Sequence, residues 1–264
     1  MSTRLKQFTA RVQAREQLSE HLIRLRLDSA DRGRGAADWF PSTGIPDEWI
    51  GLTVPGQFQT RYYTVRSYDG RELVLDVVVH EVGLVTEWAS RECLGEVVTI
   101  TEPRGLFAPP TDATWLILVG DLTALPAMAR IAEHTTLPTK IWAEVPDDLR
   151  GYLPESAEVT WLKVGAAGSR LAEVVETLQW PPGPGYFWMA GESAQMRAIR
   201  KHLLSERHGS AYDVTGYWRI AAARQPRAVD PGPIWRAGKA AGRTDDEIWA
   251  TYDQARELSV GETS

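Results

Sequence analysis

Cysteine is nearly absent from this sequence, whose 264 residues include one, Cys93. A lone cysteine excludes an internal disulfide, a cysteine-ligated iron–sulfur cluster and a cysteine-rich zinc site. No apolar run approaches the length of a membrane span, and the first residues contain no apolar signal segment. We therefore expect a cytoplasmic protein that does not interact with membranes.

Basic charge is also scarce, because 29 lysines and arginines are outnumbered by 35 acidic residues and leave a net charge of −6. Nucleic acids are therefore not expected partners. The sequence contains no GxxxxGK[ST], HExxH or GxSxG motif, and its five histidines lack the spacing of metal ligands. Kinase, hydrolase and metalloenzyme functions are thus disfavoured, and no metal site is predicted.

The first hundred residues have the alternation of apolar and polar residues that is typical of half-buried strands. Asp69-Gly70 is a hairpin signal. Loops rich in Gly, Pro and Asp are expected at Asp31–Gly35 and Pro41–Pro55. About six strands with short turns predict a six-stranded antiparallel β-barrel. The strand candidates are Phe8–Leu18, His21–Ser29, Phe58–Tyr68, Glu72–Glu81 and Glu96–Thr101.

The pattern changes after Pro109-Pro110, where strands begin to alternate with helices. This order predicts a parallel α/β sheet and places a domain boundary near residue 110, giving domains 1–110 and 111–264. Thr123 is expected to cap the first helix. The predicted strands are Trp115–Val119, Lys140–Val145, Val159–Val164, Tyr186–Ala190 and Tyr212–Tyr217, and the predicted helices are Ala124–Glu133, Arg170–Leu178 and Ala194–Arg207.

The C-terminal tail differs in charge from the rest of the chain. Six basic residues and one acid lie between Gly216 and Arg243. A capping box, Thr244 to Glu247, then predicts a C-terminal helix over Asp245–Arg256.

The stretch Arg61-Tyr62-Tyr63-Thr64-Val65-Arg66 lies on a predicted strand of the barrel. Arg61 and Tyr63 share one face of such a strand. An arginine can bind a phosphate with two hydrogen bonds, and a tyrosine ring can stack on a flavin. The alternative is a strand whose aromatic residues reflect β-propensity alone.

Several segments resemble, in order, those of the siderophore-interacting protein family of ferredoxin-reductase-like flavoproteins. RYYTVR is similar to its RxYTxR flavin motif, and residues 120–127, GDLTALPA, to its GDxTALPA turn. Ala190-Gly191-Glu192 looks like its AGE turn, and residues 216–219 match its GYWR signature. The resemblance covers about residues 8–256. It implies an FAD-binding barrel followed by an NAD(P)H-binding α/β domain.

The resemblance implies that Arg61 binds the FAD diphosphate, Tyr63 stacks on the isoalloxazine, and Thr64, the catalytic residue, faces its reactive N5 edge. His80 and the turn from Gly83 to Thr86 would hold the rest of the cofactor, helped by the amides of a short helix at Val85–Arg91. The turn reads Gly-Leu-Val-Thr instead of the family's usual Gly-Pro-Ala-Ser. The complete expected cofactor set is Arg61, Tyr63, Thr64, Val65, Arg66, His80, Gly83, Val85 and Thr86.

The resemblance also implies a nicotinamide site at the carboxyl ends of the α/β strands, where open sheets bind ligands. Helix capping is the alternative for Asp121 and Thr123. The residues do not distinguish NADH from NADPH, and ferredoxin is a further possible donor. The expected site residues are Asp121, Thr123, Ala124, Gly191 and Glu192.

The basic tail is the predicted substrate site, because ferric catecholate siderophores are anionic and an acidic protein needs a positive patch to bind them. The alternative is a solvated charged loop. An Ala- and Pro-rich insertion, Ile220–Ile234, separates GYWR from this segment. The expected substrate-binding residues are Arg219, Arg236, Lys239 and Arg243.

These observations predict a monomeric FAD-dependent ferric-siderophore reductase, which passes electrons from NAD(P)H or ferredoxin through FAD to Fe(III) and so releases Fe(II). One alternative is a general flavin-dependent diaphorase or ferric reductase. Another is a siderophore-binding module without redox chemistry.

Overall fold

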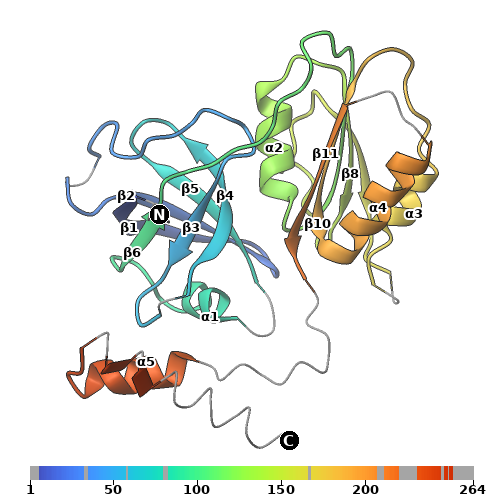
Figure 1. Cartoon of the computed structure of the whole chain (residues 1–264). Helices are drawn as coiled ribbons and strands as arrows, with labels where there is room; N and C mark the ends of the chain where they lie inside the picture. Colours follow the sequence, from blue (N-terminus) through green and yellow to red (C-terminus); the bar gives the residue numbers. More distant parts are fainter. Residues whose placement is uncertain are drawn as a thin grey trace, which may run out of the picture.

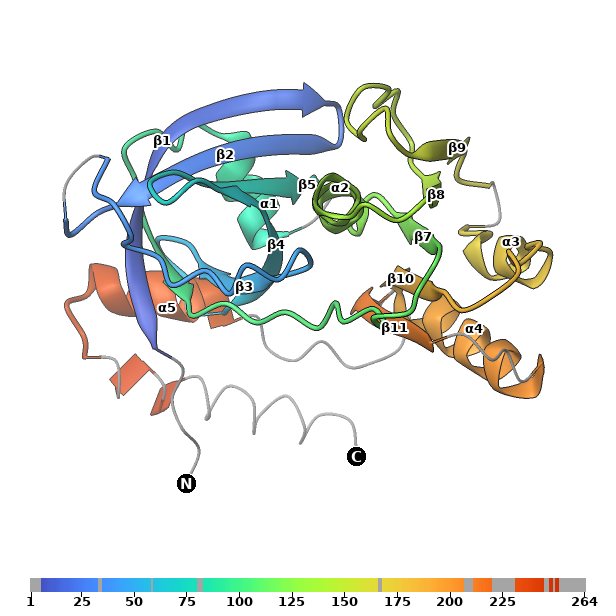
Figure 2. The ribbon, with the colours of Figure 1, turned by 90° about the horizontal axis from the view of Figure 1, so that it is seen from above.

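The computed structural model describes residues 6–32, 35–57, 59–79, 83–165, 168–206, 211–219, 231–244, 247–248 and 250–251. It contains a closed six-stranded barrel and a five-stranded parallel sheet. The helix α2 (Leu125–His134) lies between them in both views of the ribbon (Figure 1, Figure 2). The predicted fold class is therefore confirmed.

Alternating apolar residues build the barrel. In β2, Ile23, Leu25 and Leu27 face the barrel core and are at most 1% exposed. Neighbouring strands are antiparallel throughout, in the closed order β1-β2-β5-β4-β3-β6. The strands are β1 (Gln7–Ser19), β2 (Leu22–Ser29), β3 (Trp49–Thr53), β4 (Arg61–Tyr68), β5 (Leu73–Val78) and β6 (Val97–Thr101).

The expected loop over Pro41–Pro55 is wrong in part, because it contains the strand β3. This strand pairs with β4 on one side and β6 on the other. Its Gly51 lies so close to Thr60 and Thr101 that a Cβ atom would be 2.5 Å and 3.0 Å from their methyl groups. Strand pairing therefore determines this segment, although its glycine and flanking prolines favour a loop.

The parallel sheet has both faces covered by helices. Leu116 and Leu118 of β7 pack towards α2, whereas Ile117 and Val119 pack towards α3 and α4. This two-sided burial explains the continuous apolar run in β7. In the sheet order β11-β10-β7-β8-β9, the strands are β7 (Leu116–Asp121), β8 (Thr139–Glu144), β9 (Glu158–Leu162), β10 (Tyr186–Glu192) and β11 (Ala211–Trp218), and the outer helices are α3 (Leu171–Glu176) and α4 (Ser193–Glu206).

The predicted capping role of Thr123 is wrong. The N-cap of α2 is Ala124, and no side chain caps this helix. The Thr123 hydroxyl instead donates to Asp121 Oδ1 over 2.5 Å. Asp121 is 8% exposed at the end of β7, so its carboxylate needs hydrogen-bond donors, whereas the amides of Ala124 and Leu125 at the helix start already donate to backbone carbonyl oxygens.

Two further helices lie outside the sheet layers. The short helix α1 (Leu84–Ser90) contributes Val85, Trp88 and Ala89 to the barrel core. Helix α5 (Pro231–Ala240) lies on the barrel side of the molecule and begins inside the predicted Ile220–Ile234 insertion (Figure 1, Figure 2). No helix in the described part of the chain combines the length and the apolar character needed to cross a membrane.

The capping box after α5 is present. Thr244 N donates to Glu247 Oε2 over 2.8 Å, and Glu247 N donates to Thr244 Oγ1 over 3.4 Å. Of the predicted helix Asp245–Arg256, residues 247, 248, 250 and 251 are described and are helical. The rest of that helix lies outside the described residues.

Candidate functional site

The strand β4, which carries the RYYTVR segment, is paired differently along its length. From Arg61 to Thr64 it pairs with β3, whereas its pairing with β5 starts only at Val65. Among the described residues, no strand therefore pairs with Arg61–Thr64 on the edge that faces β5. An open strand edge offers backbone donors and acceptors to a ligand.

Arg61 lies at the exposed beginning of β4. Its guanidinium donates to Gln59 Oε1 over 2.6 Å and to the Thr60 carbonyl oxygen over 3.3 Å. Among the described residues, no carboxylate forms an ion pair with it. A guanidinium without a carboxylate partner among the described residues suits a phosphate ligand.

The two tyrosines of the segment have different surroundings. Tyr63 is half-buried, pairs with Ile50 and packs against the barrel core. Burial raises the pKa of its phenol, so the ring remains neutral. Tyr62 lies on the opposite face of the strand and is 67% exposed.

Thr64 connects the barrel with the α/β sheet. Its side chain is buried and lies close to the phenol of Tyr217 from β11. Burial raises the pKa of Tyr217 above its ordinary value, so this phenol also remains neutral. The RYYTVR segment of β4 and the carboxyl end of β11 thus lie next to each other at Thr64 and Tyr217.

The last two residues of the motif, Val65 and Arg66, have different surroundings. Val65 is fully buried in the barrel core. Arg66 forms a bidentate ion pair with Glu133 of α2, with N–O distances of 2.5 Å and 2.8 Å. Its guanidinium carbon is 5.3 Å from the centre of the Tyr152 ring. The structure therefore places Arg66 at the contact between the barrel and α2.

The predicted phosphate turn is described from Gly83 onward, and His80 lies outside the described residues. Gly83 is the N-cap of α1, and Val85 is 3% exposed in the barrel core. The Thr86 hydroxyl donates to the Val78 carbonyl oxygen over 3.3 Å. By their chemistry, the guanidinium of Arg61 and the first amides of α1 suit a diphosphate, and the ring of Tyr63 suits a planar ring.

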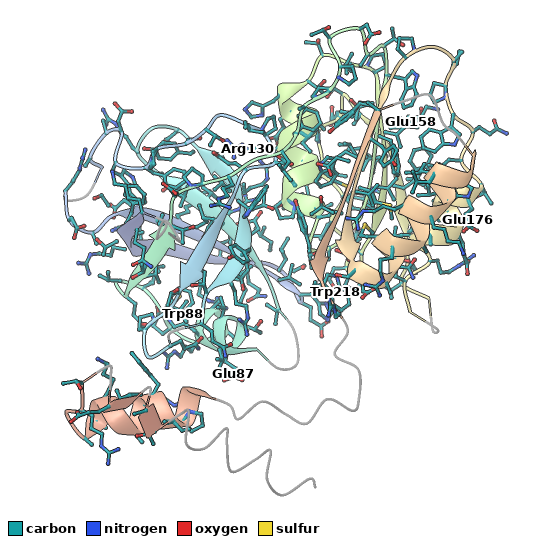
Figure 3. All side chains as sticks on the ribbon, in the orientation of Figure 1. Glu87, Trp88, Arg130, Glu158, Glu176 and Trp218 are labelled. Atoms are coloured by element: carbon teal, nitrogen blue, oxygen red, sulfur yellow. The ribbon has the colours of Figure 1, made fainter. Side chains whose placement is uncertain are left out.

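Asp121 organises the carboxyl end of β7. Besides the Thr123 hydroxyl, its carboxylate accepts the Thr123 N–H over 2.9 Å and the indole N–H of Trp218 over 2.7 Å. Burial raises the pKa of this carboxyl group. Gly191 lies against it, since a Cβ there would be 2.6 Å from Asp121 Oδ2. Trp218, labelled in Figure 3, is thereby fixed at the end of β11.

Two predicted nicotinamide residues have structural contacts instead of open surfaces. Glu192 is 4% exposed and accepts the amides of Ala194 and Gln195 at the start of α4. Ala124 is fully buried, and a Cβ on Gly120 would be 2.5 Å from its own.

The four predicted substrate residues do not gather in one place. Arg236 and Lys239 are exposed on α5, and Arg243 follows three residues after its end. Lys239 Nζ is 5.0 Å from the centre of the Trp235 ring. Arg219 directly follows β11, and this strand end lies apart from α5 in both views (Figure 1, Figure 2).

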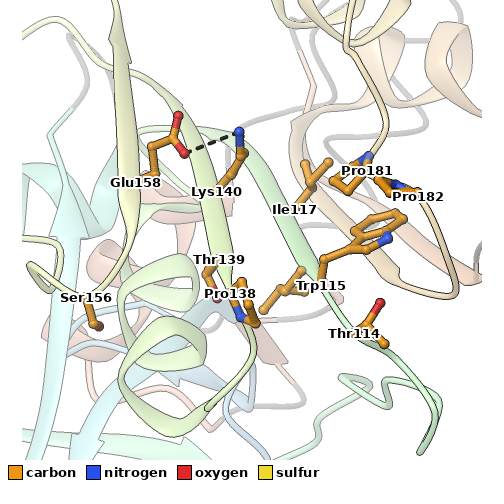
Figure 4. Close-up of a pocket in the computed structure, with 11 residues that line it drawn as sticks. Thr114, Trp115, Ile117, Pro138, Thr139, Lys140, Ser156, Glu158, Pro181 and Pro182 are labelled. Atoms are coloured by element: carbon orange, nitrogen blue, oxygen red, sulfur yellow. Dashed lines mark ion pairs between the residues drawn. The ribbon is translucent and has the colours of Figure 1, made fainter.

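Two pockets lie on the α/β unit, and neither is lined by a predicted site residue. One, with a volume of about 450 Å³, lies at the amino ends of β7 and β8 (Figure 4), whereas Asp121 lies at the carboxyl end of β7. It includes the Lys140–Glu158 ion pair. The other, of about 390 Å³, lies beside the loops that follow β8 and β9.

One group of side chains that could ligate a metal occurs among the described residues. Ligand atoms of Glu20, His21 and Asp147 lie within 4.8 Å of one another. His21 Nδ1 and Asp147 Oδ1 are 2.8 Å apart and already form a hydrogen bond with each other.

Sequence reasoning assigned no contact with the motif to Tyr217, which lies in the GYWR segment, or to Glu48 and Arg130. Arg130 donates to the Val65 carbonyl oxygen and to Glu48, which is fully buried. One signal was available for Arg130: it stands in an otherwise apolar stretch, LPAMARIA, where a charge requires a buried partner. No sequence signal identifies Glu48 as that partner.

Family comparison agrees with this geometry. Residues 13–107 match the siderophore-interacting FAD-binding domain, and residues 113–221 match the siderophore-interacting protein family. This chain belongs to the siderophore-interacting protein family. Its barrel is accordingly the FAD-binding domain of this family.

Individual relatives support the assignment. An uncharacterized protein of Mycobacterium tuberculosis is 32% identical over 217 residues, which cover 73% of this chain and 74% of the relative. The ferric vibriobactin reductase ViuB of Vibrio cholerae is 31% identical over 68% of this chain and 65% of that protein. The crystal structure of a siderophore utilization protein from T. fusca superposes with a TM-score of 0.68 at 27% identity, over 84% of this chain and 95% of that chain.

Proposed function

We propose that this protein is an FAD-dependent ferric-siderophore reductase. The observation that carries the proposal is the packing of the motif strand against the α/β unit, where Arg130 of α2 donates to the carbonyl oxygen of Val65, the residue after Thr64. A two-domain reductase needs this juxtaposition, because the electron donor must meet the flavin. The likeness to a ferric vibriobactin reductase supports the substrate class.

In this proposal the barrel holds FAD through β4 and α1. Arg61 binds the diphosphate, together with amides at the start of α1, and Tyr63 supports the flavin ring. Thr64 offers its backbone and hydroxyl to the ring edge. When bound, FAD supplies the ability to accept two electrons together, as a hydride, and to release them singly.

The carboxyl end of β7 is the proposed nicotinamide site. The turn at Asp121–Thr123 precedes α2 and adjoins Gly191, so a nucleotide could approach the backbone closely there. NADH or NADPH is the proposed donor, and ferredoxin is the alternative.

The exposed cations of α5 and its following turn are the proposed contacts for an anionic ferric chelate. Arg236, Lys239 and Arg243 supply local positive charge to a protein with a net charge of −6. Siderophores bind iron through hard oxygen ligands that prefer Fe(III), so reduction to Fe(II) loosens the complex.

The visible absorption spectrum of the purified protein, before and after addition of FAD, tests this proposal. We expect two flavin bands that NADH or NADPH bleaches without oxygen and that a ferric siderophore restores, with one Fe(II) formed for each electron. Absence of the bands even with added FAD would refute the flavin assignment and favour a binding module.

Substrate comparison separates the reductase from a general diaphorase. A ferric-siderophore reductase oxidises the reduced flavin faster with a ferric siderophore than with quinone or dye acceptors. Equal rates with all acceptors would favour the diaphorase. Bands that neither nucleotide bleaches would point to ferredoxin as the donor.

A further inference from the structure

Arg130 and Glu48 form a buried ion pair where α2 packs on the barrel. Their side chains are 5% and 0% exposed, and Arg130 Nη2 donates to Glu48 Oε1 over 2.9 Å. Figure 3 shows Arg130 on the side of α2 that faces the barrel. Desolvation of two charges cancels much of their attraction, so such a pair is a weak source of stability and calls for another explanation.

The pair binds the motif strand next to Thr64. Arg130 Nη1 donates to the carbonyl oxygen of Val65 over 2.9 Å. The Val65 N–H donates to the backbone carbonyl of Glu48, also over 2.9 Å. Both backbone polar groups of the residue after Thr64 are therefore held by this pair.

The Glu48 carboxylate is itself rigidly held. It accepts the Ser42 hydroxyl over 2.6 Å, and the amide and hydroxyl of Thr43 over 2.7 Å each. Arg130 supplies the fourth hydrogen bond. A carboxylate that accepts four hydrogen bonds has little freedom to move, so it holds the Arg130 guanidinium at a fixed position on the barrel.

The other end of α2 leads to the proposed nicotinamide site. The helix starts at Leu125, directly after the turn that contains Asp121 and Thr123. At a rise of 1.5 Å per residue, Arg130 lies about 8 Å along the helix from Leu125. Because the helix is continuous, a shift at Arg130 would also move the turn.

We infer that Arg130 is a positioning residue, which fixes the nicotinamide turn relative to the Thr64 edge of the flavin motif. Its guanidinium joins the helix of the turn to the backbone beside Thr64, with Glu48 as the anchor. The inference rests on the proposed function, specifically on its nicotinamide donor. Arg130 would thus affect hydride transfer from the α/β unit without touching the nicotinamide ring or the flavin ring.

Arg130→Lys tests the inference, because lysine keeps the charge beside Glu48 but lacks the fork that reaches two acceptors at once. We expect the dissociation constant of FAD, measured by titration of the flavin-free protein, to stay within about threefold of the wild-type value. The rate of flavin bleaching by the nucleotide in anaerobic stopped flow should fall by about tenfold to a hundredfold, as expected for a small misplacement.

Two further measurements distinguish a misplaced nicotinamide from a general loss of structure in the variant. The long-wavelength absorbance of a nicotinamide stacked on flavin should weaken in Arg130→Lys. Flavin reduced with dithionite should be reoxidised by the ferric chelate at the wild-type rate, because that step does not involve the nicotinamide turn. Lys140→Met, which removes an exposed ion pair at the far end of the sheet, is the matched control and should behave as wild type.

The double variant Glu48→Leu with Arg130→Met covers the case in which a single change prevents folding, because it leaves no buried charge unpaired. This double variant should bind FAD, and the nucleotide should reduce its flavin more slowly than that of the wild type. Wild-type reduction rates in Arg130→Lys, or an equal loss in both half-reactions, would overturn the inference while the proposed function stands. Failure of both nucleotides to reduce the wild type would refute the nicotinamide donor and the inference together.

Discussion

At the scale of single residues, the motif strand shows how one short segment serves several purposes. Arg61 remains exposed with neutral partners, Thr64 is buried against Tyr217, and Val65 belongs to the barrel core. The alternation of the strand decides which side chains face the core. Contact with the α/β unit then decides which of the remaining side chains are covered.

Arg61→Ala is expected to weaken FAD binding by about tenfold to a hundredfold, the loss associated with hydrogen bonds to a charged group. Fluorescence titration of the flavin-free protein measures this change. Arg61→Lys should recover part of the affinity, because it keeps the charge but not the fork. Arg71→Ala, which removes an exposed arginine from the β4–β5 turn, is the control; full flavin retention in Arg61→Ala would contradict the assignment.

At the scale of elements, local signals and tertiary pairing differ in strength. The Asp69-Gly70 turn forms between β4 and β5 as its sequence predicts, with Gly70 at a φ of 91°. The Asp69 carboxylate accepts the amides of Arg71 and Glu72 over 2.8 Å and 2.7 Å. By contrast, β3 carries weak local signals and depends on its two neighbouring strands.

The hairpin turn should add a pH-dependent contribution to stability. Its two amide hydrogen bonds lower the pKa of Asp69 below the ordinary 3.8. Because the pKa is lower in the folded state, the contribution is fully present above the unfolded pKa and is lost as the pH falls through the folded one. Asp69→Asn keeps an acceptor but no charge.

Thermal melts from neutral pH to below pH 3.8 test this expectation. The wild type should have the higher Tm at neutral pH, and the difference from Asp69→Asn should shrink in the acid range. A difference that does not change with pH would show that the charge of Asp69 contributes nothing.

At the scale of the whole molecule, buried polar contacts join the two units. Besides Glu48–Arg130, the buried carboxylate of Asp76 in β5 accepts the Arg24 guanidinium and the Tyr152 hydroxyl. Tyr152 belongs to the segment after β8, so this cluster also spans barrel and α/β unit. The alignment of the two units therefore depends on hydrogen-bonded charges as well as on apolar packing.

Glu48→Ala should lower the free energy of unfolding by about 3–5 kcal/mol, because it leaves the Arg130 charge buried without its partner. Denaturant unfolding of the flavin-free protein measures the loss. Glu48→Leu combined with Arg130→Met should cost clearly less than Glu48→Ala. A larger loss in the double variant would mean that the ion pair itself stabilises the fold.

The sequence alone determined the features that repeat along the chain or lie within a few residues. Alternation and apolar runs predicted a barrel and a parallel sheet, because side-chain periodicity reports how many faces of an element are buried. The motifs and their order along the chain indicated the family. Segment order and the Asp69-Gly70 turn are likewise local properties.

Only the tertiary structure decided which distant residues meet. Glu48 and Arg130 are 82 residues apart, and Thr64 finds Tyr217 on the last strand of the sheet. It also made a strand of the segment around Gly51 and gave Thr123 a partner other than the helix end. Periodicity shows that a side chain is buried but not against what, since that depends on how separately formed elements pack.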